Sequence, residues 1–89
     1  MPYSYRLADD VVFKEVSRGG VLLSRKSGEY RQVNATGARV LQLVVAGEPW
    51  QALLDDMVQL YPTVEPSQIS QDLSGMLAEL EGAGVLVRV

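Results

Sequence analysis

The 89-residue sequence predicts one α+β domain in which a three-stranded antiparallel sheet comes before three helices. Two observations lead to this order. Residues 11–33 alternate short β-branched or aromatic segments with glycine-containing turns, whereas residues 38–80 repeat apolar side chains at helical spacing between prolines and glycines. A chain of this length has material for one hydrophobic core, so residues 1–89 should form a single domain.

Three short strands are predicted over residues 11–16, 21–25 and 29–33. These segments are rich in β-branched, aromatic and leucine side chains that favour extended backbone. The connecting segments 17–20 and 26–28 are short and contain glycine, as in tight turns between antiparallel neighbours. The three strands should therefore form an antiparallel meander.

Two helices should come next. The first covers residues 38–45, because residues 34–37 offer capping side chains before it and Gly47 stops it. Pro49 suits the first turn of the second helix, and Pro62 ends it. The apolar side chains of the second helix recur with the helical period: Trp50, Leu53, Leu54, Met57, Val58 and Tyr61. We expect Trp50 to belong to the core.

A third helix begins at Pro66 and closes near Gly82 and Gly84. Its apolar stripe consists of Ile69, Leu73, Met76, Leu77 and Leu80. Residues 85–89 are apolar enough to dock as a short strand. Residues 1–8 are either a flexible arm or include a short strand over residues 3–7. Strands combined with three helices describe a winged helix-turn-helix-like fold.

The composition argues against an enzyme. The chain has neither histidine nor cysteine, so no imidazole or thiolate can serve as base, nucleophile or metal ligand. The acidic pairs at residues 9–10 and 55–56 point apart in a strand or helix, and Gly19-Gly20 lacks the Lys-Ser/Thr of a phosphate-binding loop. We therefore predict no catalysis, no metal and no cofactor.

A targeting or membrane segment is not expected either. Residues 1–6 lack the apolar stretch of a secretory signal, and the longest apolar run, residues 43–46, is too short to span a bilayer. We predict a cytoplasmic protein without a membrane partner.

The net charge of −3 is unevenly distributed along the chain. Residues 1–33 carry six basic and four acidic side chains, whereas residues 34–89 carry two basic and seven acidic ones. The N-terminal part is thus either the better surface for an acidic partner or simply solvated. The third helix has no Lys or Arg, although a DNA-reading helix needs basic side chains. Nucleic acid is not the expected partner, and a DNA-binding winged-helix regulator is only an alternative.

The predicted meander has an edge that can bind a peptide. If residues 29–33 are an edge strand, their free main-chain groups can pair with an extended peptide, whose alternate side chains enter a groove beside a helix. On the third helix, the leucines of the stripe are either core or groove lining. Met76 and Asp72, nearer the border of the stripe, favour the groove.

Four further side chains near this strand have open roles. Arg25, Lys26 and Arg31 either meet acidic side chains of the peptide or are solvated, and Tyr30 is either a packed strand aromatic or a wall of the groove. The complete set of candidate peptide-binding residues is Arg25, Glu29, Tyr30, Arg31, Gln32, Val33, Ile69, Asp72, Leu73, Met76, Leu77 and Leu80.

Three motifs resemble a known family when they are taken in order. They are Val21-Leu22-Leu23 followed by Lys26-Ser27-Gly28-Glu29-Tyr30, then Val33-Asn34-Ala35-Thr36-Gly37-Ala38, and last Asp72-Leu73 with Met76-Leu77, Leu80 and Gly84-Val85-Leu86. Their order and spacing, over about residues 10–87, resemble the PqqD-like domains. Those domains are recognition elements for ribosomally made, post-translationally modified peptides (RiPPs).

The resemblance implies a winged helix-turn-helix domain whose third strand and third helix grip a precursor's leader peptide, which adds as a further antiparallel strand. The matching positions are residues 29–33 and Asp72, Leu73, Met76, Leu77 and Leu80. The short chain is similar to standalone members of lasso-peptide pathways. That likeness implies a cysteine-protease-like leader peptidase and an asparagine-synthetase-like cyclase as partners, and a leader with a Tyr-x-x-Pro motif.

The pyrroloquinoline-quinone branch of the family is the alternative. There the resemblance implies a peptide chaperone for a radical SAM enzyme. Residues 9–13, Asp-Asp-Val-Val-Phe, depart from the proline-containing start of the first strand in that branch. In either branch the implied role is tethering, because leader capture raises the effective concentration of the precursor near the enzymes that modify it.

Overall fold

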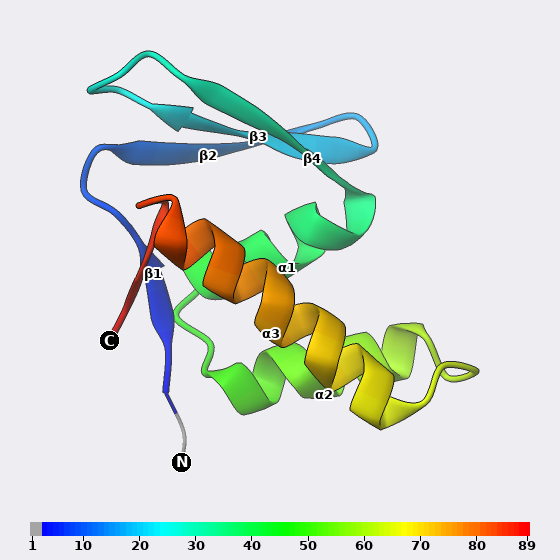
Figure 1. The fold of residues 1–89 in the computed structure, drawn as a ribbon. Helices are drawn as coiled ribbons and strands as arrows, with labels where there is room; N and C mark the ends of the chain where they lie inside the picture. The colour runs from blue at the N-terminus through cyan, green and yellow to red at the C-terminus, as the bar shows by residue number, and fades with distance from the viewer. Residues whose placement is uncertain (1–2) are drawn as a thin grey trace.

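The computed structural model describes residues 3–89 and contains a main sheet, a small second sheet and three helices (Figure 1). The strands of the main sheet, in spatial order, are β2 (Val11–Val16), β3 (Gly19–Ser24) and β4 (Tyr30–Asn34), and all pair antiparallel. The helices are α1 (Ala35–Val45), α2 (Trp50–Leu60) and α3 (Pro66–Gly82). The predicted α+β fold, a three-stranded antiparallel sheet before three helices, is confirmed.

The second sheet joins the two ends of the described chain. Strand β1 (Tyr5–Leu7) pairs antiparallel with β5 (Leu86–Arg88), so the predicted docking of the tail is confirmed. Of the two alternatives for the N-terminal segment, the strand is correct and the flexible arm is wrong for residues 3–8. Residues 1 and 2 of the predicted arm lie outside the described residues.

Two further contacts fix the N-terminal segment. The backbone N–H of Trp50 donates to the carbonyl of Tyr3 at 2.8 Å, and that of Val89 donates to Ser4 at 2.8 Å. The indole of Trp50 stacks on the ring of Tyr3 with centroids 6.0 Å apart. Trp50 is half-buried at the border of the core, because Tyr3 covers one of its faces.

The first hairpin is tighter than predicted. Gly19 and Gly20 belong to β3 rather than to the turn, which leaves Ser17-Arg18 as a two-residue connection. Arg18 has a φ of 64°, in the left-handed region that such tight turns require. A Cβ on Gly20 would lie 2.5 Å from the Phe13 ring, so the glycine lets this ring pack directly on the neighbouring strand.

Helix α1 begins three residues earlier than predicted. Its N-cap is Asn34, whose side-chain oxygen accepts the backbone N–H of Gly37 at 2.8 Å. An asparagine at this position satisfies one of the free N–H groups of the first turn, so the helix starts at Ala35. Helix α2, in contrast, ends at Leu60, and Tyr61 is its C-cap rather than part of its apolar stripe.

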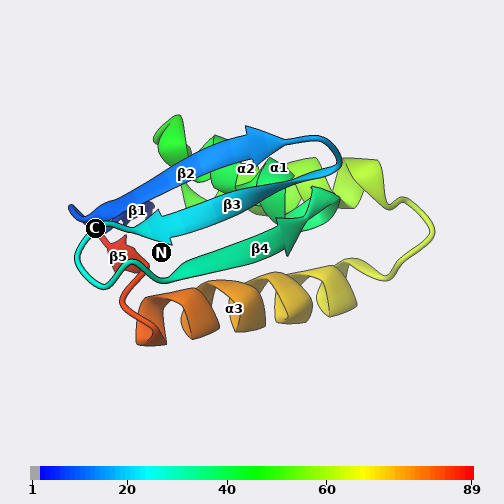
Figure 2. The same ribbon diagram turned by 90° about the horizontal axis from the view of Figure 1, so that it is seen from above.

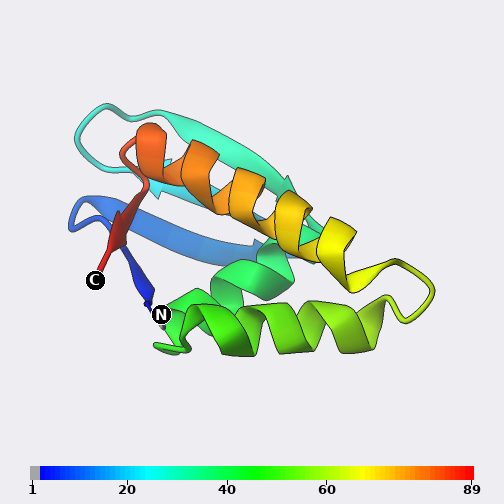
Figure 3. The same cartoon turned by 60° about the horizontal axis from the view of Figure 1, so that its bottom comes forward.

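All three helices lie on one face of the main sheet, and the core is between them (Figures 1 and 3). The fully buried side chains come from every layer: Leu22, Val40, Leu41, Val44, Leu53, Leu77 and Leu86. Burying each of them contributes roughly 1.5–3 kcal/mol. In the described part of the chain, the other face of the sheet carries no helix, and there Leu23 and Tyr30 are 41% and 67% exposed.

A bidentate ion pair joins α1 to α2. The guanidinium of Arg39 donates to both carboxylate oxygens of Asp56, at 3.0 and 2.8 Å. The hydrogen bonds from Arg39 hold the pKa of Asp56 below its usual range, although partial burial opposes this shift. Over residues 3–89, every helix is too short or too polar to cross a membrane.

Candidate functional site

Among residues 3–89, strand β4 has no strand partner on one side of its backbone. Its one strand partner in the described chain is β3, and α3 runs along the side of β4 that faces away from β3 (Figures 1 and 2). Near the start of β4, the N–H of Gly28 donates to the Ser24 carbonyl at 2.9 Å and the N–H of Ser24 donates to Glu29 at 2.8 Å. Gly28 has a φ of 75°, so two residues oppose Ser24 in a glycine β-bulge.

The bulge determines which main-chain groups of β4 face the open edge. Hydrogen-bonded and non-hydrogen-bonded pairs alternate along an antiparallel ladder. Counting from Ser24, the pairs of Arg31 with Leu22 and of Val33 with Gly20 are hydrogen-bonded. The N–H and C=O groups of Tyr30 and Gln32 therefore point away from β3, toward α3.

Three adjoining cavities follow this edge and continue past the end of β4 along α3, and together they form what we call the edge groove. The middle cavity, of about 300 Å³, is lined by Arg31, Gln32, Val33, Asn34, Gly37, Met76, Glu79 and Leu80. Its walls are thus one strand, the first turn of α1 and the C-terminal half of α3. A peptide lying here as a strand would meet β4 on one side and α3 on the other.

The apolar cavity, of about 350 Å³, lies beyond the end of β4. It is lined by Asn34, Thr36, Gly37, Val40, Met57, Tyr61, Val64, Ile69, Asp72, Leu73 and Met76. Its floor comes from buried core residues of all three helices. The hydroxyls of Thr36 and Tyr61 are hydrogen-bonded to each other and tie the first turn of α1 to the end of α2. Apolar walls of this kind suit one large apolar side chain.

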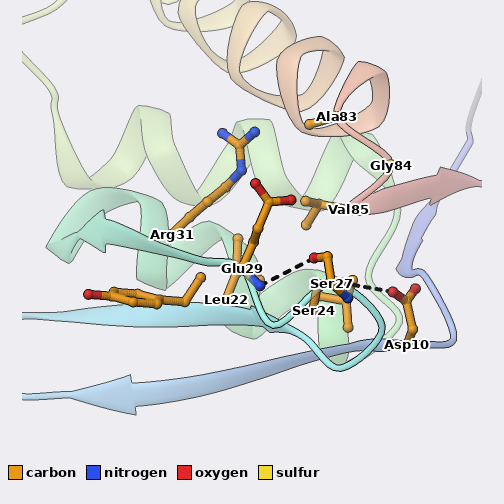
Figure 4. A pocket seen from close by; sticks show the side chains of 11 residues that line it. Asp10, Leu22, Ser24, Ser27, Glu29, Arg31, Ala83, Gly84 and Val85 are labelled. Atoms are coloured by element: carbon orange, nitrogen blue, oxygen red, sulfur yellow. Dashed lines mark hydrogen bonds between the residues drawn. The ribbon is translucent and has the colours of Figure 1, made fainter.

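The polar cavity, of about 400 Å³, lies at the other end, where β4 begins and α3 ends (Figure 4). Glu29 and Arg31 project from the strand side toward Ala83, as Figure 4 shows. Ser24 Oγ donates to Asp10 at 2.9 Å, and the N–H of Glu29 donates to Ser27 Oγ at 3.2 Å. The edge groove thus changes from apolar to charged along its length.

Most of the residues predicted from the sequence are brought together in this groove. Ten of them line at least one of its cavities: Glu29, Tyr30, Arg31, Gln32, Val33, Ile69, Asp72, Leu73, Met76 and Leu80. Leu73 and Leu80 are also buried, so they serve both the core and the groove wall. Tyr30 turns its side chain to the open face of the sheet, and its backbone is the part that faces the groove.

Two predicted residues lie elsewhere. Leu77 is fully buried in the core and lines none of the three cavities. Arg25 lies with Lys26 in an open depression formed with Arg6 and residues 8–10. The positions of Leu77 and Arg25 in the fold do not favour contact with a bound peptide. Such contact stays a prediction.

Sequence reasoning missed the contributions of α1 and α2 to the groove. Gly37, Thr36, Tyr61 and Val64 line its apolar end. The motif Asn34-Ala35-Thr36-Gly37 was visible as a helix start, but no local pattern places a helix start beside a strand edge. Glu79 was visible as an acidic residue of the third helix without any sign that it faces β4.

Two solved structures are similar to this chain over nearly its whole length. The first is TbiB1 in complex with the TbiA(beta) leader peptide, with a TM-score of 0.84, 26% sequence identity, and coverage of 91% of this chain and 93% of that one. The second is a lasso peptide synthetase B1 complexed with the leader peptide, with a TM-score of 0.81, 25% identity, and coverage of 94% and 98%. Among curated proteins no relative matches.

A family model agrees with these likenesses. Residues 19–86 match the model described as coenzyme PQQ synthesis protein D (PqqD). The matched segment runs from the start of β3 to the first residue of β5, so it contains β4, all three helices and the lining of the edge groove except Asp10 and Val11. The resemblance inferred from the three sequence motifs is thereby confirmed, and the chain belongs to the PqqD family.

Proposed function

We propose that this protein binds the leader peptide of a ribosomally made precursor as an additional antiparallel strand on β4. The observation that carries the proposal is the open edge of β4, whose free N–H and C=O groups face a line of cavities closed by α3. Main-chain pairing would supply affinity for any extended peptide, and the cavities would select side chains. Both similar solved structures are complexes with leader peptides, which supports this assignment.

An antiparallel strand fixes the direction of the bound peptide. Strand β4 runs from the polar cavity at Tyr30 to the apolar cavity at Asn34. The N-terminal part of an antiparallel leader would then lie at the apolar cavity, where the tyrosine of a Tyr-x-x-Pro motif could anchor. The C-terminal part would leave past Glu29 and Gly84, toward the segment that is to be modified.

The role that follows is presentation rather than catalysis. A bound leader keeps the rest of the precursor close to this domain, so an enzyme that also docks here meets its substrate at a high effective concentration. We propose a cysteine-protease-like leader peptidase and an asparagine-synthetase-like cyclase as these enzymes, in a lasso-type pathway. The likeness to a lasso peptide synthetase B1 supports this choice of pathway.

The family description favours one second candidate. A match to coenzyme PQQ synthesis protein D fits a peptide chaperone for a radical SAM enzyme. The same groove would bind the peptide, and only the precursor and the enzyme would differ.

A direct titration tests the proposal. Labelled synthetic leaders with a Tyr-x-x-Pro motif, scrambled versions of them, and a random DNA duplex would be titrated with the protein and followed by fluorescence anisotropy. We expect saturable binding of the leaders, weaker binding of the scrambled peptides, and no binding of DNA, because α3 has no basic residue. Binding of DNA alone, or of leader and scrambled peptide equally, would overturn a sequence-selective leader site.

A further inference from the structure

Met76 stands between two cavities of the edge groove. Three residues line both the middle and the apolar cavity, namely Asn34, Gly37 and Met76. Asn34 is held by its capping hydrogen bond to Gly37, which has no side chain. The only long, unconstrained side chain in this partition is therefore that of Met76.

The surroundings of Met76 leave it room to move. Within the α3 stripe, Leu73, Leu77 and Leu80 are buried, whereas Met76 is only partly buried. Its Cε lies 3.5 Å from the position that a Cβ on Gly37 would occupy, so the methyl tip rests over bare helix backbone. A methionine has three rotatable side-chain bonds and can change rotamer without moving the helix.

The core-facing walls of the apolar cavity are fixed, whereas its outer rim is exposed. Met57, Ile69 and Leu73 are buried in the core, and the hydroxyl pair of Thr36 and Tyr61 closes the far side. A side chain that enters from the groove can therefore gain space toward the middle cavity by displacing Met76.

We propose that Met76 is a movable wall that sets the size of the anchor side chain the groove accepts. When a peptide lies on β4, its anchor displaces the Met76 side chain and enters the apolar cavity, which then joins the middle cavity. Leu fits with little displacement, Tyr needs the wall to move, and a larger ring exceeds the space that the wall can release. This inference rests on the proposed leader binding and assigns its side-chain selectivity to one residue.

Substitutions at Met76 test the wall. The probes are synthetic Tyr-x-x-Pro leaders in which the tyrosine is kept or replaced by leucine or 2-naphthylalanine. With Met76→Ala, we expect the affinity for the naphthyl peptide, relative to the leucine peptide, to rise about tenfold over wild type. With Met76→Ile, whose β-branched side chain is stiff, we expect the tyrosine peptide to lose about tenfold while the leucine peptide keeps its affinity.

Gly37→Ala tests the same movable wall by placing a methyl group opposite the Met76 side chain. The added Cβ would lie 3.3 Å from Val33 Cβ, 3.4 Å from Asn34 Oδ1 and 3.5 Å from Met76 Cε, so it restricts the methionine and also makes a tight contact with Val33. As with Met76→Ile, we expect this variant to lose affinity for the tyrosine peptide and to keep its affinity for the leucine peptide. Ser74→Ala, exposed on the same helix, is the matched control and should leave the ratios unchanged. Thermal unfolding of each variant checks that it is folded.

The position of the Met76 methyl group gives an independent readout. Its ¹³C resonance, assigned by its disappearance in Met76→Ala, should shift more with the tyrosine peptide than with the leucine peptide. Affinity ratios that are equal in wild type and all Met76 variants, while every leader still binds, would overturn the movable wall and leave leader binding intact. Wild-type protein that binds none of the leaders would instead overturn the proposed function, and the wall with it.

Discussion

The two sheets of this protein differ in what lies beside their outer strands. The small sheet, which we call the closed sheet, ties the two ends of the described chain together: Tyr5 pairs with Arg88, Ser4 bridges to Pro49, and the rings of Tyr3 and Trp50 stack beside it. The main sheet leaves β4 open, with α3 standing beside it across a groove. An exposed edge invites pairing with another chain, so the β4 edge beside α3 offers a place for an incoming strand.

The closed sheet also explains why the groove stays open. The chain leaves α3 and enters β5 through Val85 and Leu86, which are both buried, so the end of the helix is held by the small sheet. At its other end, Ile69 and Leu73 pack into the core with α2. Helix α3 is thus supported at both ends and does not need β4 as a support.

The largest expected effect comes from breaking the closed sheet. Leu86→Ala removes a side chain that is 2% exposed and leaves a cavity, so we expect a loss of about 2–4 kcal/mol in the free energy of unfolding. Urea unfolding would measure this loss. Leu23→Ala on the open face of the main sheet, where the side chain is 41% exposed, is the control and should cost less than about 1 kcal/mol. Equal losses would contradict the distinction between the two regions.

The open edge can be tested by removing one main-chain donor. Gln32→Pro deletes an N–H that points toward the groove, so leader affinity should fall at least about tenfold with little loss of stability. Anisotropy and thermal unfolding would measure the two effects. Arg31→Pro is the matched control, because its N–H pairs with Leu22 and its loss should unfold or strongly destabilise the protein. Unchanged leader binding by folded Gln32→Pro would rule out strand addition at this edge.

A smaller effect is expected where α1 meets α2 beneath the groove. The pKa of Asp56 is lowered by Arg39, so the pair stabilises the fold above the usual carboxyl pKa, and this contribution is lost as the pH falls through the lowered value. Because both side chains are partly exposed, Asp56→Asn should cost about 0.5–1 kcal/mol at neutral pH. Urea unfolding at pH 7 and about pH 2 would show the difference from wild type shrinking in acid. A difference independent of pH would argue against the ion pair.

The smallest effect concerns the cation beside the closed sheet. The guanidinium of Arg88 lies 4.6 Å from the centre of the Tyr3 ring and 3.4 Å from Glu81. Arg88→Met keeps the chain length and removes the charge, and should destabilise the fold less than any of the changes above. Burial raises the pKa of Tyr5, and the hydrogen bond from Arg88 opposes this shift. Near-ultraviolet titration should therefore show a later tyrosine ionisation in the variant, whereas an unchanged titration would contradict the contact.

The same contrast shows what the sequence could predict. Strands β2 to β4 and the three helices follow from local patterns, because turns, caps and apolar periodicity are properties of neighbouring residues. Strand β1 could be offered only as an alternative, since its partner β5 lies about 80 residues away and three residues carry no pattern of their own. Within the site, β4 and α3 were predicted, whereas Gly37 and Tyr61 were not, because they reach the groove only through tertiary packing.

The closed sheet has one more consequence, for protein engineering. Because Val89 donates a hydrogen bond to Ser4, the N- and C-terminal ends of the described chain lie side by side, and Figure 1 shows them pointing away from the main sheet. A short glycine-serine linker could join them, and new ends could be opened at the exposed turn of Ser17 and Arg18. Such a circular permutant would keep β4 and α3 uninterrupted, and a reporter protein fused at the new ends would leave the groove free.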